Sequence, residues 1–499
     1  MTTQTLAPAA NPRRTRFPNP RSAGPFLVPA VVAVALLVTE GLSQAVTPFI
    51  RKDDWPFLVP AGTTGVPSAV AHDLTEGRWL NTAWWHLVGQ YGTPTTAALT
   101  YAAGYALLVA GLWRVLHHAG IRPGPLVDAL LGLAVFASAV WVQLLYWPGT
   151  LTPSVLVAAA GAWTLPWAAR SRVGLGAWLL LTEVAAVLSY PPVGVVLVLF
   201  AVVLLRDAPW RGVLALLGGW VAAFAVGVGI AYTLNWVAFG DFGLKIASWR
   251  HPDPLTSLHA LHVNASRYVH ASLSLWAGQW WAAVAAAVAV VVGWRDPAVR
   301  PRLERLLVGL AVVATMDAAQ TLLTGIVTEA RGQLWTWLVA LLPVALLLDG
   351  RRVLHLGLPR GRWLPVDRLA VAALVVLAAG GVLAWRADVG EHQSTRAQYA
   401  AIAADATHAR PDGKDPVVVV YQDPAVRPTR AGNIMAGTLR FAVRQDDEGT
   451  FPRWCTPVEC REIAARTHSR GHGSVFDLGR IGNLPDVVAV VVPTPPTWI

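Results

Sequence analysis

Two adjacent acidic residues, Asp53 and Asp54, follow the first long apolar segment of the chain. Carboxylates beside an apolar surface are unfavourable unless they bind a cation, share a proton or take part in a reaction. Such a pair is suited to accepting a proton from a hydroxyl group. Two plainer interpretations stay open: both residues are ordinary polar members of a loop, or one faces a site while the other caps a helix.

The composition that surrounds this pair is typical of a polytopic membrane protein. The chain has 499 residues, of which 55% are hydrophobic and 14% are charged, whereas a soluble domain usually has about 25% charged residues. Apolar segments of about 20 residues recur, and these are too long for the strands of a membrane barrel. The 24 Trp residues suit two membrane–water interfaces. The net charge of +10 is spread over many loops, so we expect no nucleic-acid partner.

The apolar segments predict about 11 transmembrane helices. We expect them at 24–43, 95–115, 124–145, 151–168, 173–189, 191–205, 212–235, 272–293, 306–325, 332–349 and 369–386. The stretch 173–205 is broken at Tyr190-Pro191-Pro192, so it is either two spans or one kinked helix. Two spans give cytoplasmic loops rich in Lys and Arg, with the N-terminus inside and the C-terminal segment outside.

The organisation that follows has three parts: a disordered cytoplasmic leader at 1–23, a transmembrane domain at 24–386, and an extracytoplasmic domain at 387–499. Two long outer loops, 44–94 and 236–271, interrupt the transmembrane domain, and the first is expected to contain amphipathic helices at the membrane surface. The last part contains two strand-like segments and one helical segment, which predict a small α/β domain.

Both cysteines of the chain, Cys455 and Cys460, lie in this last part. An extracytoplasmic location favours a disulfide between them. Their spacing, with no other cysteine, does not predict a zinc site. His259 and His262 of the second outer loop have no nearby carboxylate, so we predict no metal site there either.

Three short motifs carry a resemblance to a known family. Asp53-Asp54-Trp55, then Gly77-Arg78-Trp79-Leu80, then Ser189-Tyr190-Pro191-Pro192 resemble the C-type integral-membrane glycosyltransferases (the GT-C fold), in particular the O-antigen-type glucosyltransferase branch. The likeness covers roughly residues 1–240. That branch tends to have a polar residue after the Tyr, where this chain has Pro191. The resemblance implies a GT-C-like all-α fold with outer-face amphipathic helices.

The resemblance also implies an activity. It is an inverting hexosyl- or pentosyltransferase of the bacterial inner (plasma) membrane. Its donor is a polyprenyl-phosphate sugar, and its acceptor is an extracytoplasmic cell-envelope glycan or lipid. A carboxylate then takes the acceptor proton, and we favour Asp54 over Asp53 for this role. A positive charge steadies the departing phosphate, and whether a divalent cation supplies part of it is left open.

Outer-face residues that could contact the donor phosphate or the substrate are few. Arg331 is the one basic residue of the turn at 329–333, and Arg suits bidentate phosphate binding, although a lone Arg at a membrane surface also commonly anchors a helix. Arg78 has an alternative role as an ion-pair partner of Asp73 or of the Asp pair. The full set of candidates is Arg331, Lys245, Arg250, Arg78, Tyr190, Trp55 and His72.

Two other functions compete with this interpretation. Glu183 and Asp317 lie inside predicted spans, and carboxylates in such positions are typical of proton-coupled transport. A transporter or flippase of a lipid-linked or envelope precursor is therefore the alternative, although no internal repeat of the spans supports it. A non-catalytic scaffold whose C-terminal part binds an envelope partner is the third possibility.

Overall fold

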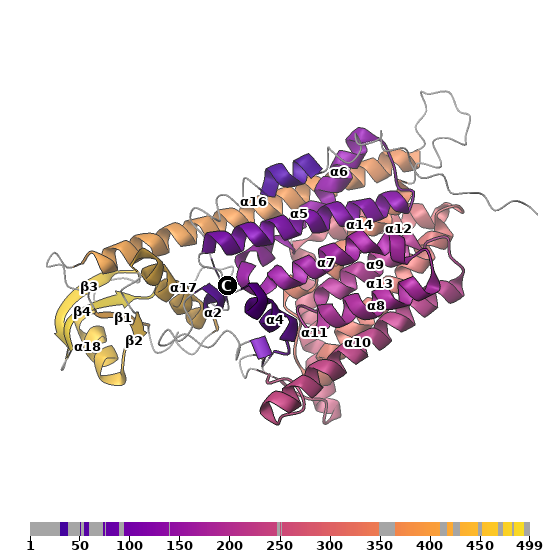
Figure 1. Cartoon of the computed structure of the whole chain (residues 1–499). Helices are drawn as coiled ribbons and strands as arrows, with labels where there is room; N and C mark the ends of the chain where they lie inside the picture. The colour runs from indigo at the N-terminus through magenta and orange to yellow at the C-terminus, as the bar shows by residue number, and fades with distance from the viewer. Residues whose placement is uncertain are drawn as a thin grey trace, which may run out of the picture.

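A computed structural model describes residues 30–37, 50, 54–58, 73–74, 76–88, 94–138, 140–246, 250, 252–348, 365–409, 417–422, 430–447, 452–467, 473–481 and 484–493. The described chain is mostly helical and ends in a small sheet (Figure 1). Residues 30–37 are helical and pack into the main core through Ala33 and Leu37, and the short helices α2 (Trp55–Leu58) and α4 (Trp79–Val88) follow them before the bundle. The helices of the bundle are α5 (Pro94–His118), α6 (Pro125–Phe136), α7 (Pro148–Ala168), α8 (Arg172–Val187), α9 (Pro192–Leu204), α10 (Trp210–Phe239), α11 (Leu258–Gly278), α12 (Trp280–Arg295), α13 (Arg300–Thr324), α14 (Trp335–Leu347) and α16 (Pro365–Thr407).

The apolar helices support the prediction of a membrane protein. Within the described ranges, α5, α10, α13 and α16 are long and apolar enough to cross a membrane. The pair α11 and α12 makes a fifth span if its two parts, which meet at an angle of 90°, are counted together. The helices α6, α9 and α14 are apolar but shorter. The larger count of 11 spans stays a prediction.

The segment 124–145, expected to be one span, is divided in the structure. Helix α6 ends at Phe136, and a separate 3-10 helix, η2 (Val142–Tyr146), follows. Side chains from other helices bind the carbonyls at the end of α6: Tyr105 Oη donates to the Phe136 oxygen at 2.6 Å, and Trp337 Nε1 donates to the Ala134 oxygen at 2.9 Å. These donors satisfy carbonyls that helix continuation would otherwise bind, so the helix can stop there.

Helix α7 lies at the centre of the bundle because small residues let α5 approach it closely. A Cβ atom at Gly104 of α5 would lie 2.7 Å from Val155 Cγ1, and one at Gly111 would lie 2.9 Å from Ala162 Cβ. Close backbone approach at small residues is the usual way in which helices associate in lipid. The position of α7 is therefore fixed along its length, and its first turn is presented at one end of the bundle.

Helix α16 joins the bundle to the C-terminal sheet without a break. It has 43 residues, which corresponds to roughly 65 Å of helix and is about twice the thickness of a bilayer hydrocarbon core. The boundary expected at 386–387 therefore falls inside a helix, and the helical segment expected near 394–408 is its continuation. Figure 1 shows α16 running along the bundle and reaching the sheet.

The C-terminal domain consists of the second half of α16 together with α17 (Arg430–Asp446), α18 (Pro457–Thr467) and four strands. The strands are β1 (Val417–Tyr421), β2 (Arg453–Trp454), β3 (Val475–Ile481) and β4 (Leu484–Val491), in the sheet order β2-β1-β4-β3. β1 pairs in parallel with β2 and β4, and β3 pairs antiparallel with β4. Alternate residues of β1 and β4 face two cores, one shared with α16 and α17 and the other with Ile463 of α18.

Two glycines of α16 allow a test of its packing. A Cβ atom at Gly381 would collide with the carbonyl oxygen of Ala137, whereas nothing lies within 4 Å of one at Gly390. We expect Gly381→Ala to lower stability by about 1–3 kcal/mol, as overpacking does. The matched control Gly390→Ala should be neutral or should stabilise by roughly 0.5–1 kcal/mol, since glycine weakens a helix. Thermal unfolding of the solubilised protein measures both, and equal effects would contradict this packing.

Candidate functional site

Asp54 binds the first turn of α7. Its carboxylate accepts the N–H of Gly149 at 2.5 Å and the N–H of Thr150 at 2.6 Å, and the residue is fully buried. Pro148 begins the helix and has no N–H, so Gly149 and Thr150 supply the first donors that need a partner. A carboxylate at this position also interacts favourably with the helix dipole. The sequence left open whether this residue is an ordinary loop residue or caps a helix, and in the structure it caps α7.

Three residues predicted for the site cannot be placed. Asp53 and His72 lie outside the described residues, and only the backbone of Trp55 is described.

Asp73 is a second buried carboxylate beside Asp54. Its exposure is 0%, and neither of its oxygens has a partner of hydrogen-bonding geometry in the described part of the chain. Burial raises the pKa of Asp73 to about 8, and the charges of Glu76 and Asp54 add to the rise. The Arg78 guanidinium and the side chain of Asn81, which lies close by, act in the opposite direction on this pKa. Asp73 is thus a carboxyl that changes charge near neutral pH.

The turn after Asp73 presents Arg78. Gly77 has a φ of +77°, a conformation that side chains other than glycine rarely adopt, and the N–H of Arg78 donates to the Asp73 carbonyl at 2.9 Å. Arg78 forms an ion pair with Glu76 at 2.6 Å, and Arg250 approaches the same carboxylate at 3.4 Å. Arg78 therefore pairs with Glu76, while its charge also acts on Asp73.

Arg331 lies on the 3-10 turn η4 (Ala330–Gly332). Its guanidinium lies 4.0 Å from the ring centre of Trp147 and forms an ion pair with Glu329 at 2.8 Å. Tyr190 donates its hydroxyl to the Arg331 carbonyl at 3.2 Å. An aromatic face under a guanidinium holds the cation by cation–π attraction, and the side chain remains 22% exposed.

Tyr190 lies between these cations. Burial raises the pKa of Tyr190 to about 12, while Arg331, Arg78 and Arg250 lower it and Glu329 raises it. The charges of three arginines from distant parts of the chain therefore act on one phenol, which contacts the Arg331 backbone directly. Tyr190 stays neutral near pH 7 and acts there as a hydrogen-bond donor.

Lys245 does not join this group. It is exposed after the end of α10 and makes no ion pair with the residues that the structure describes. No three His, Cys, Asp or Glu side chains gather to hold a metal ion, within the same described ranges.

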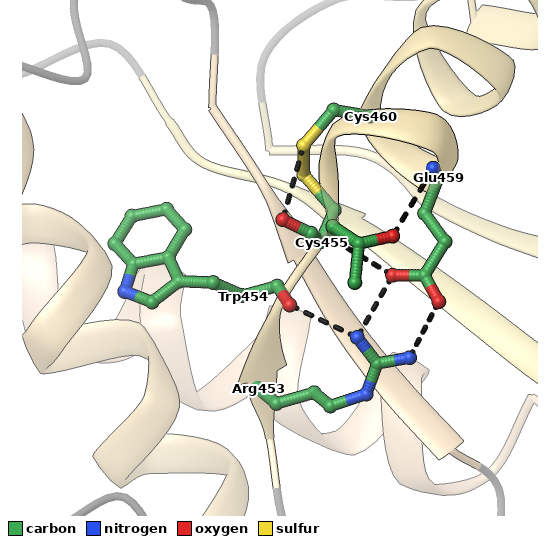
Figure 2. The surroundings of a disulfide bond; sticks show 6 residues. Arg453, Trp454, Cys455, Glu459 and Cys460 are labelled. Atoms are coloured by element: carbon green, nitrogen blue, oxygen red, sulfur yellow. Dashed lines mark hydrogen bonds and ion pairs between the residues drawn. A yellow bond between two sulfur atoms is a disulfide. The ribbon is translucent and has the colours of Figure 1, made fainter.

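The two cysteines form a structural unit in the C-terminal domain. Cys455 and Cys460 are joined in a disulfide with their Cα atoms 5.2 Å apart (Figure 2). Beside it, Arg453 binds Glu459 through two hydrogen bonds of 2.8 and 2.7 Å. The bond from Arg453 holds the pKa of Glu459 at about 2, with burial acting against it. This unit fastens the start of α18 to β2.

Comparisons with protein-family models, with curated proteins and with solved structures found no match to the chain.

The structure brings together Asp54, Arg78, Tyr190, Arg250 and Arg331 from the predicted set and leaves Lys245 apart. Sequence reasoning missed Asp73 as a member of the site and considered it only as an ion-pair partner of Arg78. One signal was available: Gly77 four residues later marks a turn, which can fold an acidic residue inward.

Asp73→Asn tests this electrostatic environment independently of any activity. The Asp73 carboxyl loses its proton near pH 3.8 in the unfolded protein but only near pH 8 in the folded protein. Between these two values it is charged in the unfolded state and neutral in the folded state. The wild type therefore loses up to about 1.4 kcal/mol of stability per pH unit in this window. Asp73→Asn has no such carboxyl and does not lose this stability. The difference in stability between the variant and the wild type, measured by thermal unfolding, should therefore grow from pH 5 to pH 8 and then level off.

The control for this experiment is Asp241→Asn, which changes an exposed carboxylate. Because this side chain is exposed in the folded protein, the variant should not reproduce the growing advantage expected of Asp73→Asn. An advantage of Asp73→Asn that is constant from pH 5 to pH 9 would show that Asp73 is not protonated in the folded protein.

Proposed function

We propose that the protein is a membrane glycosyltransferase that transfers a sugar from a polyprenyl-phosphate donor to a cell-envelope acceptor outside the bacterial inner membrane. The observation that supports this is the convergence, at one end of an apolar helical bundle, of two buried carboxylates with three arginines. The carboxylates are Asp54 and Asp73, and the arginines are Arg78, Arg250 and Arg331. In this proposal the bundle has the GT-C fold with 11 spans, and the C-terminal domain is extracytoplasmic.

The arginines provide the positive charge that a phosphate leaving group requires. Arg331 is oriented by Trp147 and Glu329 and is partly exposed. A guanidinium presents paired N–H donors that match phosphate oxygens. Arg78 and Arg250 share the carboxylate of Glu76, so the Arg78, Arg250 and Glu76 group keeps a net positive charge. Phosphate binding by these side chains stabilises the charge that develops as the sugar–oxygen bond breaks.

The proton acceptor in this proposal is an Asp of the first outer loop. The acceptor hydroxyl attacks the anomeric carbon, its proton passes to the carboxylate, and polyprenyl phosphate leaves. Asp54 suits this role poorly because two N–H donors already bind its oxygens. Asp73 suits it better, since no backbone N–H among the described residues occupies its oxygens, although the Asn81 side chain is near enough to act on it as a donor, and its pKa of about 8 is close to neutral. Asp73 is buried, so an acceptor reaches it only by displacing part of its cover.

The proposal predicts distinct kinetic effects for residues inside and outside the group. With protein in liposomes and a labelled polyprenyl-phosphate hexose, Asp73→Asn should lower kcat on the order of 10²–10⁴-fold, because a general base is lost. Arg331→Ala should lower kcat by about 10²-fold, because transition-state charge is less stabilised. Lys245→Ala is the control and should change the rate little.

If the reconstituted and folded wild type transfers no sugar from any polyprenyl-phosphate donor, the proposal is wrong. Full activity of Asp73→Asn alongside an active wild type would instead remove only the assignment of Asp73.

Transport is the second candidate function, and one buried group favours it. Glu183 of α8 is 2% exposed, packs against Gly194, and its Oε1 atom has no hydrogen-bond partner among the residues described. Carboxylates of this kind carry protons in transporters. Asp317 of α13 also has an oxygen without such a partner there.

Glu183→Gln and Asp317→Asn distinguish the two functions. A glycosyltransferase should retain sugar transfer in Glu183→Gln, because Glu183 lies in α8 away from the arginine group. Asp317 lies next to Thr328 and Trp335, on either side of the Arg331 turn, so Asp317→Asn is assayed for transport alone. A transporter should instead lose uptake or flipping of its cargo, measured in the same liposomes with a fluorescent lipid-linked sugar. Loss of transfer in Glu183→Gln, with unchanged thermal unfolding, would count against the glycosyltransferase assignment of the site.

A further inference from the structure

Residues 146–150, which we call the junction segment, contact four separate parts of the molecule. Tyr146 Oη donates to Asp388 Oδ2 of α16 at 2.9 Å, and Trp147 lies under the Arg331 guanidinium. Gly149 supplies the first of the two N–H groups that bind Asp54. The Thr150 carbonyl accepts Asn81 Nδ2 of α4 at 2.9 Å. A shift of this segment therefore moves the carboxylate side and the cation side of the candidate site together.

The C-terminal domain holds the junction segment through α16. The ring of His392 stacks on Tyr146 with centroids 3.9 Å apart and an interplanar angle of 13°. His392 Nδ1 is 2.6 Å from the Asp388 carbonyl, which orients the ring. Both residues are on the part of α16 that continues into the core of the C-terminal domain, where Tyr399 and Ile402 pack. Because the helix is unbroken, any displacement of the domain is transmitted to Tyr146.

The same domain also touches the other side of the Asp54 contact. Phe441 of α17 is 3% exposed and lies in one apolar cluster with Ile50, Phe57, Leu58, Trp85 and Ala97. Phe57 stacks on Trp85 with ring centroids 4.9 Å apart and follows Asp54 by one turn of chain. Figure 1 places α17 next to α2, between the sheet and the bundle. The domain thus contacts both partners of the bond: α2, which directly follows Asp54, and the segment that begins α7.

We infer that the C-terminal domain positions the candidate site by contacting both sides of the bond between Asp54 and α7. It contacts Tyr146 on the α7 side, and its own Phe441 contacts the Asp54 side. Tyr146 and Phe441 are positioning residues, since neither is placed to contact a substrate. The assignment of what the site does rests on the proposed function, whereas the mechanical coupling does not.

Hydrogen–deuterium exchange of the full-length protein in liposomes tests the coupling without any assay of activity. Tyr146→Phe removes the hydroxyl and keeps the ring, and Asp388→Ala removes its acceptor. Each should speed exchange of the Gly149 and Thr150 amides by about tenfold, the equivalent of one hydrogen bond. In the double variant these amides should exchange no faster than in the more severe single variant, because both substitutions break the same contact.

Glu391→Ala is the matched control for Asp388→Ala. It removes an exposed carboxylate from α16 only three residues away and should leave the exchange of Gly149 and Thr150 unchanged. For the contact made by Phe441, Phe441→Ala should speed exchange of the Gly149 and Thr150 amides, and Phe441→Leu should restore most of their protection. The amides of β1 and β4 serve as an internal reference, since they stay protected only if the C-terminal domain remains folded.

The outcomes separate the two proposals. Unchanged exchange at Gly149 and Thr150 in Tyr146→Phe and Phe441→Ala, with a folded domain, overturns the coupling whatever the protein catalyses. Faster exchange in a protein that transfers no sugar supports the coupling and counts against the proposed function alone. In an active protein, Tyr146→Phe should lower kcat and leave KM for the donor nearly unchanged, because it alters alignment more than binding.

Discussion

The contact between Asp54 and the first turn of α7 is the constraint on which the candidate site depends. The first N–H groups of a helix have no partner within it, and in a buried setting they must find one. Here the partner is a carboxylate 95 residues earlier in the chain. Gly149 makes this approach possible, since a Cβ atom there would lie 2.9 Å from Asp54 Oδ2. Satisfying the backbone of α7 therefore draws the segment that contains Asp54 onto the end of the bundle.

Further contacts depend on that first one. With the loop held in place, Asn81 reaches the Thr150 carbonyl, and the N–H of Leu80 donates to the Leu188 carbonyl at 2.9 Å. Leu188 directly precedes Ser189 and Tyr190, so the loop is also fixed beside the phenol that contacts the Arg331 turn. Residues that are far apart in sequence thus meet because successive backbone groups are paired, and the charged side chains occupy the positions that this pairing leaves them.

The sequence predicts the parts of this structure that follow from local pattern. Long apolar segments predict the helices, and two runs of valine predict the strands that become β1 and β4. The continuity of α16 across residues 386–394 is not predictable in this way. Hydropathy falls after Trp385, but the following residues include many good helix formers and no proline before Pro411, so the helix continues where the apolar pattern stops. Hydropathy locates lipid contact, and it does not locate helix ends.

The roles of the two carboxylates depend on long-range contacts, which no local pattern contains. Asp53-Asp54 is conspicuous in the sequence because the residues are adjacent, yet the described member of the pair is occupied by two amides of a distant helix. Asp73 is inconspicuous, and only the fold shows that it is enclosed beside Arg78, where no backbone N–H among the described residues binds its oxygens and only the nearby Asn81 side chain acts as a donor towards it. The residue type alone does not tell which aspartate caps a helix and which is enclosed as a carboxyl of raised pKa.

The difference between the two environments has a physical logic. A carboxylate that accepts two strong N–H bonds is stabilised in its charged form and is suited to holding structure in place. A carboxylate that is buried without such donors is held close to the balance between charged and neutral forms, as the pKa of about 8 for Asp73 indicates. The negative charge of Asp54 itself contributes to that balance, because it opposes ionisation of its neighbour. Burial accounts for most of the raised pKa of Asp73, and the charge of Asp54 adds a smaller part. The residue that caps α7 therefore also raises, to a small extent, the proton affinity of the carboxyl beside it.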